Sequence, residues 1–491
     1  MTVCLVIPPS PFLLDERVFM SLGVLRVAAA LEQAKAGRVE VLDLSGVSNF
    51  LDAIAAHAAT QPAAPTYGIT ATSPQLPAAV KIAAAIRAAA PASRIILGGP
   101  HPTLANAAAK REAKRSRPGR GTRAMDALRR IFDVIVAGDG ERAVIEALRA
   151  PRGSVLDADD RHSPYWLGDA DLETTPFPAR HLVDVASYRY RIDGAPALSL
   201  IAQLGCPFGC KFCAGRNSPM LRHIRTRSSA SIVAEMVEMH RHYGCTGFMF
   251  YDDELNVNTS IVELMEEIVA AQKRLGSEWR LRGFVKAELF TPQQADAMRR
   301  AGFRWLLVGF ESGSDRILDN IAKQATKEDN TRCFEIAREA GLKIKALMSL
   351  GHPGESAQTI AETTEWLLDV RADDFDATII TPYPGSPYYD DAVSDGGAWT
   401  YTAKNGDRLH QDEVDYTAEA DYYKGRPGDG YVAHVWTDHL KAHDLVRERD
   451  RLESHVRERL GIPFNPSAPA IAYEHSMGQS ALPPSILRAS A

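Results

Sequence analysis

An alternation of strand-like and helix-like segments runs through most of the chain, and it constrains the fold more than any other feature. It is clearest after residue 196, where six apolar, strand-like segments are separated by stretches of helical periodicity. Strands joined through helices pair in parallel, because each helix carries the chain back to the start of the sheet. Six units are fewer than the eight of a closed barrel, so the pattern predicts a partial, open (β/α)6 TIM-type barrel over residues 197–390. The strand candidates are 197–205, 247–253, 279–287, 304–312, 343–351 and 376–384.

The first 150 residues show a second alternation of the same kind. Short connections link strand and helix there, which predicts a doubly wound, Rossmann-like parallel sheet over residues 1–150. The fold class expected is therefore α/β. Ligands of such sheets bind at the carboxyl ends of the strands. Four glycines fall at those ends, namely Gly98, Gly99, Gly138 and Gly140.

The remaining segments carry weaker patterns. Residues 151–196 are expected to be a linker, and residues 391–491 a mostly helical C-terminal extension with a charged helix at 438–461 and a disordered tail. The aromatic residues of the extension allow two interpretations: they cap the barrel over a small substrate, or they simply pack the extension onto the protein. They are Trp399, Tyr401, Tyr416, Tyr422, Tyr423, Tyr431 and Trp436.

Length and composition exclude several classes of protein. A chain of 491 residues with 45% hydrophobic residues is long enough for two to four folded domains. Its net charge of −6 provides no global basic field for non-specific nucleic-acid binding. No apolar run reaches the roughly 18 residues of a membrane span, and the N-terminus lacks the features of a secretory signal, so a cytoplasmic protein is expected. The basic segment 110–123 is expected to be a solvated surface insertion, with a partner or an anionic substrate as the alternative.

Three cysteines crowd into eight positions directly after the first barrel strand. Cys206, Cys210 and Cys213 have spacings that let one loop wrap a metal centre, and thiolates are the ligands that iron–sulfur clusters and zinc accept. A closed zinc site needs four ligands, and the nearest candidate, His223, lies ten residues beyond Cys213. A loop with three thiolates leaves one iron of a four-iron cluster open. The spacing favours such a cluster, with zinc or a chance group of thiols as the alternatives.

The run CPFGCKFC resembles the radical S-adenosylmethionine (SAM) enzymes, whose CxxxCxxC loop holds a [4Fe-4S] cluster with SAM on its open iron. The resemblance implies that the three cysteines are the cluster ligands. It also implies further cofactor contacts at the strand ends: Phe212 near the adenine, Asp252 and Asp253 at the SAM amine, and Glu311 and Ser312 at the ribose hydroxyls. Without the resemblance, these acids and Ser312 are equally typical of solvated strand ends or helix caps.

The first domain resembles the cobalamin-binding domain that precedes this barrel in one large subgroup. The similarity lies in Pro8 and Pro9 and in the runs TATSPQ (70–75), GGPHPT (98–103) and AGDGE (137–141). It implies cobalamin contacts from Thr72, Ser73, Gly98, Gly99, Gly138 and Gly140. Glycine-rich strand ends also suit flavins, dinucleotides or plain turns. The chain has no D-x-H-x-x-G motif, so His101 is expected to be a core or surface residue rather than a cobalt ligand.

Together the two resemblances imply a cobalamin-dependent radical SAM methyltransferase that C-methylates an unactivated carbon of a small molecule. A radical rearrangement or cyclisation with the same cofactors is the first alternative, and a non-catalytic cobalamin-binding regulator or carrier is the second. Either enzyme needs an external one-electron donor such as flavodoxin or ferredoxin. The chain departs from the subgroup at Asp139, at Gln203 and Leu204, and at His352, and the last two departures leave the substrate class open.

Overall fold

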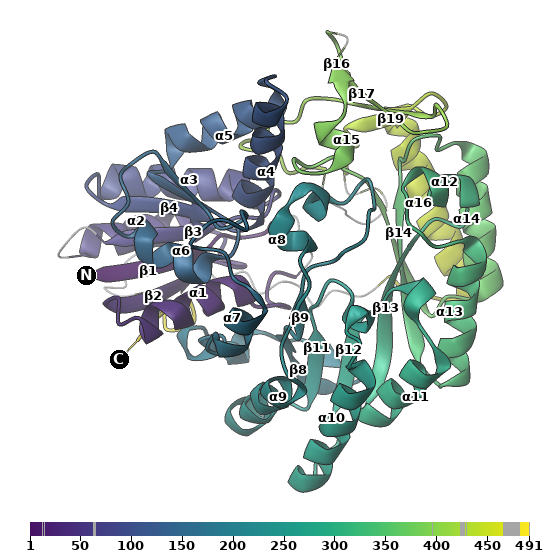
Figure 1. The fold of residues 1–491 in the computed structure, drawn as a ribbon, viewed down its shortest axis with the longest axis horizontal. Helices are drawn as coiled ribbons and strands as arrows, with labels where there is room; N and C mark the ends of the chain where they lie inside the picture. The colour runs from purple at the N-terminus through teal and green to yellow at the C-terminus, as the bar shows by residue number, and fades with distance from the viewer. Residues whose placement is uncertain are drawn as a thin grey trace.

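The computed structural model shows an α/β protein built on two seven-stranded sheets, one in each half of the molecule (Figure 1). Small satellite sheets accompany them. The structure describes residues 1–11, 13, 15–61, 65–394, 396–422, 428, 430–464 and 482–490. No helix in this part of the chain is both long and apolar enough to cross a membrane.

The first sheet has the strand order β20-β2-β1-β3-β4-β5-β6, and every pair except β20–β2 is parallel. This arrangement confirms the doubly wound first domain. The sheet continues beyond residue 150, because β6 lies in the expected linker and pairs with β5. Its strands are β1 (Thr2–Ile7), β2 (Arg38–Asp43), β3 (Thr66–Thr70), β4 (Arg94–Gly98), β5 (Val134–Ala137) and β6 (Ser154–Asp157). Its helices are α1 (Leu22–Gln33), α2 (Phe50–Thr60), α3 (Leu76–Ala89), α4 (Pro100–Lys114), α5 (Arg120–Ile131) and α6 (Gly140–Ala147).

The second sheet curls into a half barrel with the order β15-β14-β13-β12-β11-β8-β7. Its six long strands are parallel, as the partial barrel predicted, and β7 (Arg191–Ile192) closes one edge in the antiparallel direction. The helices lie on the outer face of this sheet (Figure 1). The strands are β8 (Ala195–Leu200), β11 (Gly247–Phe250), β12 (Arg280–Phe284), β13 (Phe303–Glu311), β14 (Lys343–Leu350) and β15 (Asp374–Ile379). The helices between them are α9 (Ser229–Tyr243), α10 (Ile261–Leu275), α11 (Pro292–Ala301), α12 (Asp315–Asn320), α13 (Lys327–Glu339) and α14 (Ala357–Val370).

Local sequence signals fix where the barrel helices begin and end. Thr326 and Ser356 cap α13 and α14, and each side chain accepts a hydrogen bond from the amide three residues on. Glycines in the left-handed conformation end α9 and α10, at Gly244 and Gly276. The chain therefore turns sharply from each helix into the next strand.

The C-terminal extension differs from the expectation of a mostly helical segment. It first forms a four-stranded antiparallel sheet of β16 (Val393–Ser394), β17 (Trp399–Thr402), β18 (Arg408–Gln411) and β19 (Val435–Thr437). The aromatic and β-branched residues of this segment favour strands. The charged helix follows as α16 (Ala442–Leu460).

The tail returns to the first domain, which corrects the expectation that it is disordered throughout. β20 (Leu487–Ala489) pairs antiparallel with β2 and so completes the hydrogen bonding of that strand edge. The ends of the described chain thus lie on the same side of the molecule (Figure 1). Residues 465–481 and Tyr423 lie outside the described residues.

The basic segment 110–123 is not the solvated insertion expected from its charge. Arg111 and Arg115 pair with Asp391, the Nη2–Oδ1 distances being 2.9 and 2.6 Å. Arg120 is 4% exposed, and it donates to the main-chain oxygen of Tyr389 and to Gln411. Acidic and aromatic partners from the extension explain the basic run, which holds the two halves of the molecule together.

Candidate functional site

The cysteine loop lies between the two halves of the molecule. β9 (Gln203–Leu204) pairs with β10 (Arg225–Thr226), and the three cysteines lie on the chain between them. Gly205 has a φ of +90°, and a Cβ there would lie 2.1 Å from the carbonyl oxygen of His223. Only glycine lets these two segments of the chain approach so closely. The Cys206 amide donates to the Leu221 carbonyl, and the Lys211 amide to the Ile321 carbonyl.

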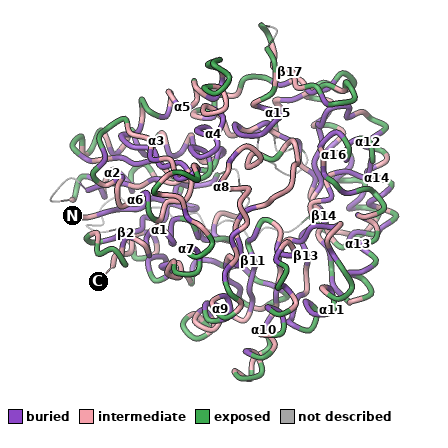
Figure 2. Tube along the Cα trace, viewed as in Figure 1, coloured by how far each residue is buried: buried purple, intermediate pink, exposed green. Residues whose placement is uncertain are grey.

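The loop faces the carboxyl edge of the first sheet. α4 begins at the carboxyl end of β4, and its Arg111 donates to Asn217, in the turn that follows Cys213. From the linker, buried Asp159 accepts hydrogen bonds from the Ser218 hydroxyl and the Met220 amide at 2.6 and 2.8 Å. Figure 2 shows the partly buried segments that surround this central region. The carboxyl ends of both sheets therefore border the three thiols.

The thiols need positive charge before they can ionise. Burial raises the pKa of Cys206 to about 11 and that of Cys213 to about 12, and it also raises the pKa of Cys210. Cys213 is the exposed member of the three, and Cys206 and Cys210 are partly buried. A bound metal centre would supply positive charge that favours the thiolates.

Two of the three acidic residues that follow β11 accept hydrogen bonds from the main-chain amides that lead into the cysteine loop. Asp252 is buried, and its Oδ1 accepts hydrogen bonds from the amides of Ala202 and Gln203. Burial raises the pKa of Asp252 to about 7. Asp253 accepts from the Gly205 amide at 3.1 Å, and its side chain is exposed. Asp253 is thus the exposed acid of the predicted pair, while Asp252 positions the loop through Oδ1 and keeps a buried Oδ2 without a hydrogen-bond partner among the described residues.

At the end of β13, the structure separates Glu311 from Ser312. Glu311 has a φ of +67° at an irregularity of the strand, which is strained for a residue with a side chain. Its carboxylate accepts from Lys323 Nζ at 3.2 Å and from the Ser349 hydroxyl at 2.7 Å. Ser312 is 1% exposed and bonds to Thr363 on α14. Its hydroxyl is buried and hydrogen-bonded within the protein, and the ribose contact expected of it stays a prediction.

A hydrogen-bonded chain links Glu311 to the aromatic residue of the cysteine loop. Ser349 Oγ lies 2.8 Å from His352 Nε2, and His352 Nδ1 lies 3.3 Å from the Tyr388 hydroxyl. The His352 ring packs edge to face on Phe212, with centroids 5.4 Å apart. His352 is fully buried, and burial lowers its pKa to about 4. The neutral His352 ring therefore packs against Phe212 and helps to fix its position.

Two lysines near the cysteine loop were not predicted from the sequence. Lys286 Nζ lies 4.3 Å from the ring centre of Phe208, between the first two cysteines. Burial alone would lower the pKa of Lys323, but the nearby Glu311 carboxylate raises it overall. Lys286 follows the third barrel strand directly, which was a usable signal. Nothing in the sequence around Lys323 distinguishes it from a surface lysine.

The predicted cobalamin contacts lie together at the carboxyl edge of the first sheet, but their surroundings differ. Thr72 is exposed, and a Cβ at Gly98 would meet only Val136, at 4.0 Å. Gly99 and Gly138 have φ of +97° and +101°, and a Cβ at either would lie 2.5 Å from the chain's own atoms. Gly140 is close to Val27 in the same way. The chain's own packing thus explains three of the four glycines without a ligand.

Ser73 and His101 form a pair beneath this edge. The Ser73 hydroxyl lies 2.9 Å from His101 Nδ1, and both side chains are buried. Burial lowers the pKa of His101 to about 4. His101 is therefore a core residue, one of the two positions expected for it, and Ser73 is hydrogen-bonded to it rather than exposed to solvent.

The aromatic residues of the extension pack against its neighbours. Tyr416 and Tyr431 donate to the carbonyls of Pro382 and Ile379, just beyond β15 and at its end. The Tyr401 ring contacts Tyr388 with centroids 4.7 Å apart. These contacts favour the packed extension over a cap that opens to a substrate.

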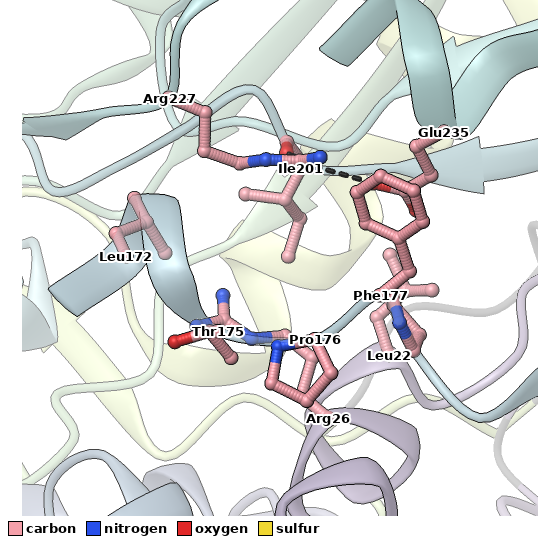
Figure 3. A pocket seen from close by; sticks show the side chains of 10 residues that line it. Leu22, Arg26, Leu172, Thr175, Pro176, Phe177, Ile201, Arg227 and Glu235 are labelled. Atoms are coloured by element: carbon pink, nitrogen blue, oxygen red, sulfur yellow. Dashed lines mark hydrogen bonds and ion pairs between the residues drawn. The ribbon is translucent and has the colours of Figure 1, made fainter. Parts of the chain in front are cut away.

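A small cavity between the first domain, the linker and the barrel is too small for a cofactor (Figure 3). Its volume of about 20 Å³ accommodates about one water molecule. Arg227 and Arg180 pair with Glu235 at its wall, and attraction to both arginines outweighs burial and lowers the pKa of that carboxyl. This buried ion network clamps the linker to the barrel.

Comparison with known proteins identifies the second half of the chain. Residues 200–367 match the family model of the radical SAM superfamily, so the chain carries a radical SAM domain. Relatives include an uncharacterized methyltransferase of Pyrococcus horikoshii, 25% identical over 61% of this chain and 63% of that protein. An anaerobic magnesium-protoporphyrin IX monomethyl ester cyclase of Cereibacter sphaeroides is 24% identical over 56% of this chain and 47% of its own length. The matches thus span about half to two thirds of these relatives.

Two solved structures have a similar fold over most of this chain. A radical SAM methyltransferase, TsrM of Kitasatospora setae, has a TM-score of 0.61 at 17% identity, over 95% of this chain and 91% of that one. It was solved with cobalamin and a [4Fe-4S] cluster bound. The cobalamin-dependent radical enzyme OxsB has a TM-score of 0.57 at 17% identity, over 79% and 55%. At these identities the likeness establishes the fold: a Rossmann-like domain followed by a radical SAM half barrel.

Proposed function

We propose that this protein is a cobalamin-dependent radical SAM methyltransferase that C-methylates an unactivated carbon of a small molecule. One observation carries the proposal: the CxxxCxxC loop lies where the carboxyl edge of the half barrel meets the carboxyl edge of the first sheet. Ligands of both kinds of sheet bind at those edges. Two cofactors bound there would be neighbours.

The residues present fit a cluster and SAM. The three thiols have raised pKa values that a metal centre would reverse, and Cys213 is open to solvent. Asp253 offers an exposed carboxylate beside the loop, and Glu311 and Lys323 offer a charged pair at the next strand ends. When bound, the cluster and SAM supply a radical that removes hydrogen from carbon, and methylated cobalamin supplies the methyl group.

For cobalamin, the fit rests on the accessible part of the first sheet's edge. Thr72 and Gly98 are open there, whereas His101 is buried and bonded to Ser73. We therefore propose that this chain holds the corrin and its tail by packing and main-chain contacts, without a histidine from this turn. Gly99, Gly138 and Gly140 shape the edge.

The inner face of the half barrel suits a substrate with an apolar part. Leu307, Leu347, Phe284 and Met249 form an apolar cluster there with Tyr190 and Ile192. Tyr251, at the end of β11, is 48% exposed and packs against both Phe284 and Phe19. Such a wall excludes water from reacting groups. An external one-electron donor and a reducing, cytoplasmic setting are part of this proposal, because exposed thiol ligands require reduction.

Methyl transfer is preferred over rearrangement because several relatives are named as methyltransferases, including a cytidylyl-2-hydroxyethylphosphonate methyltransferase of Streptomyces wedmorensis. Cyclisation stays the second candidate, since magnesium-protoporphyrin cyclases are similarly related. A non-catalytic carrier would have no use for three thiols in this spacing.

The test does not depend on knowing the substrate. The protein is reconstituted anaerobically with iron, sulfide and hydroxocobalamin, and SAM cleavage is followed under a strong one-electron reductant. We expect 5′-deoxyadenosine with retained cobalamin, and S-adenosylhomocysteine if methyl transfer occurs. Cys213→Ala should abolish both iron binding and cleavage, whereas Cys333→Ala, at a buried cysteine on α13, should keep them.

The products separate the candidates. Cleavage of SAM without S-adenosylhomocysteine would favour rearrangement over methyl transfer. A folded protein that binds cobalamin but neither iron nor SAM would revive the carrier. Absence of both cofactors would refute the proposed function.

A further inference from the structure

A second group of metal-ligating side chains lies inside the first domain, outside the site described above. The Cys4 sulfur, a carboxylate oxygen of Glu40 and a ring nitrogen of His57 all lie within 4.8 Å of one another. The three residues are 0%, 4% and 2% exposed. In the sheet register, Cys4 on β1 lies directly beside Glu40 on β2 and Tyr67 on β3. His57 completes the group from α2.

The histidine is oriented as a ligand would be. His57 Nδ1 lies 2.8 Å from the Tyr67 hydroxyl, and Nε2 lies 3.0 Å from Glu40 Oε2. Metal-bound histidines usually donate their other ring N–H to a fixed acceptor, which sets the tautomer. Tyr67 can accept from Nδ1, so that the Nε2 lone pair faces Glu40. The side-chain amide of Gln61 lies 3.2 Å from the same Nε2, and its oxygen reaches this position when the amide turns over.

The charge of the group would match a divalent cation once Cys4 gives up its thiol proton. A thiolate and a carboxylate enclosed together in an apolar core are costly unless they are compensated. Glu40 pairs with Arg38, whose Nε is 3.1 Å from Oε1 and whose side chain is 62% exposed, and its Oε2 lies 3.0 Å from His57 Nε2. A divalent ion with one thiolate and one carboxylate has zero net charge.

We propose that Cys4, Glu40 and His57 bind a structural Zn²⁺ ion, with the Gln61 amide oxygen or a water molecule as fourth ligand. One thiolate, one imidazole and one carboxylate form a donor set that zinc accepts. On binding, Zn²⁺ replaces the thiol proton of Cys4, which passes to solvent. The ion would tie two adjacent strands, β1 and β2, to α2.

Zinc is measured in the full-length protein, first as isolated and then after incubation with equimolar ZnCl₂ and gel filtration. X-ray absorption at the zinc edge counts the sulfur ligands even when an iron–sulfur cluster is present. We expect about one zinc per chain, with one sulfur at about 2.3 Å and nitrogen or oxygen at about 2.0–2.1 Å. The triple variant Cys206→Ala, Cys210→Ala, Cys213→Ala should keep this zinc and its spectrum.

Cys4→Ser and His57→Gln should each weaken zinc binding at least tenfold, while Cys333→Ser, at an unrelated buried cysteine, should not. If a ligand variant fails to fold, Co²⁺ bound to the triple variant gives a second readout, a thiolate-to-cobalt charge-transfer band. Three sulfurs at the zinc, zinc retained by folded Cys4→Ser, or folded wild-type protein that binds neither zinc nor cobalt would each overturn the proposal. None of these outcomes bears on the SAM cleavage assay.

Discussion

At the scale of single residues, the side chains around the cysteine loop divide into two kinds. Asp252 Oδ1, the Ser312 hydroxyl and the His352 ring bond to groups of the protein itself, whereas Asp252 Oδ2 is buried and has no hydrogen-bond partner among the described residues. Asp253 and Cys213 remain open to solvent, and Glu311 keeps a strained backbone conformation beside them. Strain of this kind persists where the surrounding structure enforces it, most often at functional sites. The first group therefore fixes the loop, and the second is available to ligands.

Gly205→Ala should disrupt the cysteine loop. The new Cβ would lie 2.1 Å from the His223 carbonyl oxygen, and neither backbone group can move freely. We expect a loss of about 3 kcal/mol or more in the free energy of unfolding and of most reconstituted iron. Denaturant unfolding and iron analysis measure the two effects.

Gly276→Ala is the matched control, because Gly276 has a φ of +61° with open space around its Cβ position. Its cost should be limited to about 1 kcal/mol of backbone strain, with iron binding intact. Equal iron contents in the two variants would contradict the role assigned to Gly205.

Glu355→Gln should flatten the pH dependence of stability. Glu355 is fully buried, and burial raises its pKa from 4.5 to about 7. Between these values the unfolded chain loses the proton while the folded protein keeps it, so stability falls as pH rises from about 4.5 to about 7. The variant cannot ionise, and above pH 7 it should gain up to about 3 kcal/mol relative to the native protein.

Urea unfolding at a series of pH values checks this. The Glu355→Gln advantage should vanish below pH 4.5, where both states are protonated. An advantage that does not change with pH would show that packing, and not ionisation, is responsible. Thr359, whose hydroxyl donates to Glu355, can accept from the new amide instead.

At the scale of elements, α4, α5 and the C-terminal extension act as one connector between the two halves. The Arg120 guanidinium lies between the rings of Tyr389 and Trp399, 3.9 and 4.2 Å from their centres. Arg123, one turn further along α5, pairs with Glu413 on the surface. The two arginines offer an internal comparison of buried and exposed contacts.

Arg120→Ala should lower the free energy of unfolding by about 3–5 kcal/mol, because it leaves buried Gln411 and the Tyr389 carbonyl without their donor. Arg123→Ala should cost under about 1 kcal/mol, because its partners are half exposed. Thermal and urea unfolding of both variants measure the contrast. Similar losses would mean that the connector is held by surface charge rather than by burial of Arg120.

Sequence patterns predicted the elements well where the pattern is local. The six barrel strands and the cysteine loop follow from periodicity and spacing within short windows. The contacts of segment 110–123 and the role of Lys323 depend on residues far along the chain, and no local pattern encodes them. Strand β20 was not predicted for the same reason, because three residues at a sheet edge leave no periodic signal.

At the scale of the whole molecule, the first sheet is built from both ends of the described chain. β20 covers the edge of β2, with Leu487 beside Leu42 and Ala489 beside Glu40. Ile486 is 3% exposed in the core of the first domain. The last strand of the chain therefore belongs to the first domain in space, although the barrel separates the two in sequence.

Deleting the chain from Leu482 onward should lower the free energy of unfolding by about 2–4 kcal/mol, because it removes the buried Ile486 side chain and bares the β2 edge. Hydrogen exchange should accelerate in β2 before it does in the barrel strands. Arg488→Ala, which loses only a partly exposed pair with Asp184, should cost under about 1 kcal/mol. Unchanged exchange in β2 after the deletion would refute this role for β20.

The position of β20 also sets an order of events during protein synthesis. The ribosome finishes β2 long before it reaches residues 487–489. The β2 edge of the nascent first domain therefore stays unpaired while the entire barrel is translated. A bare edge of this kind pairs readily with strands of other chains. Chains whose translation stalls within the barrel should therefore be the form of this protein most prone to aggregate.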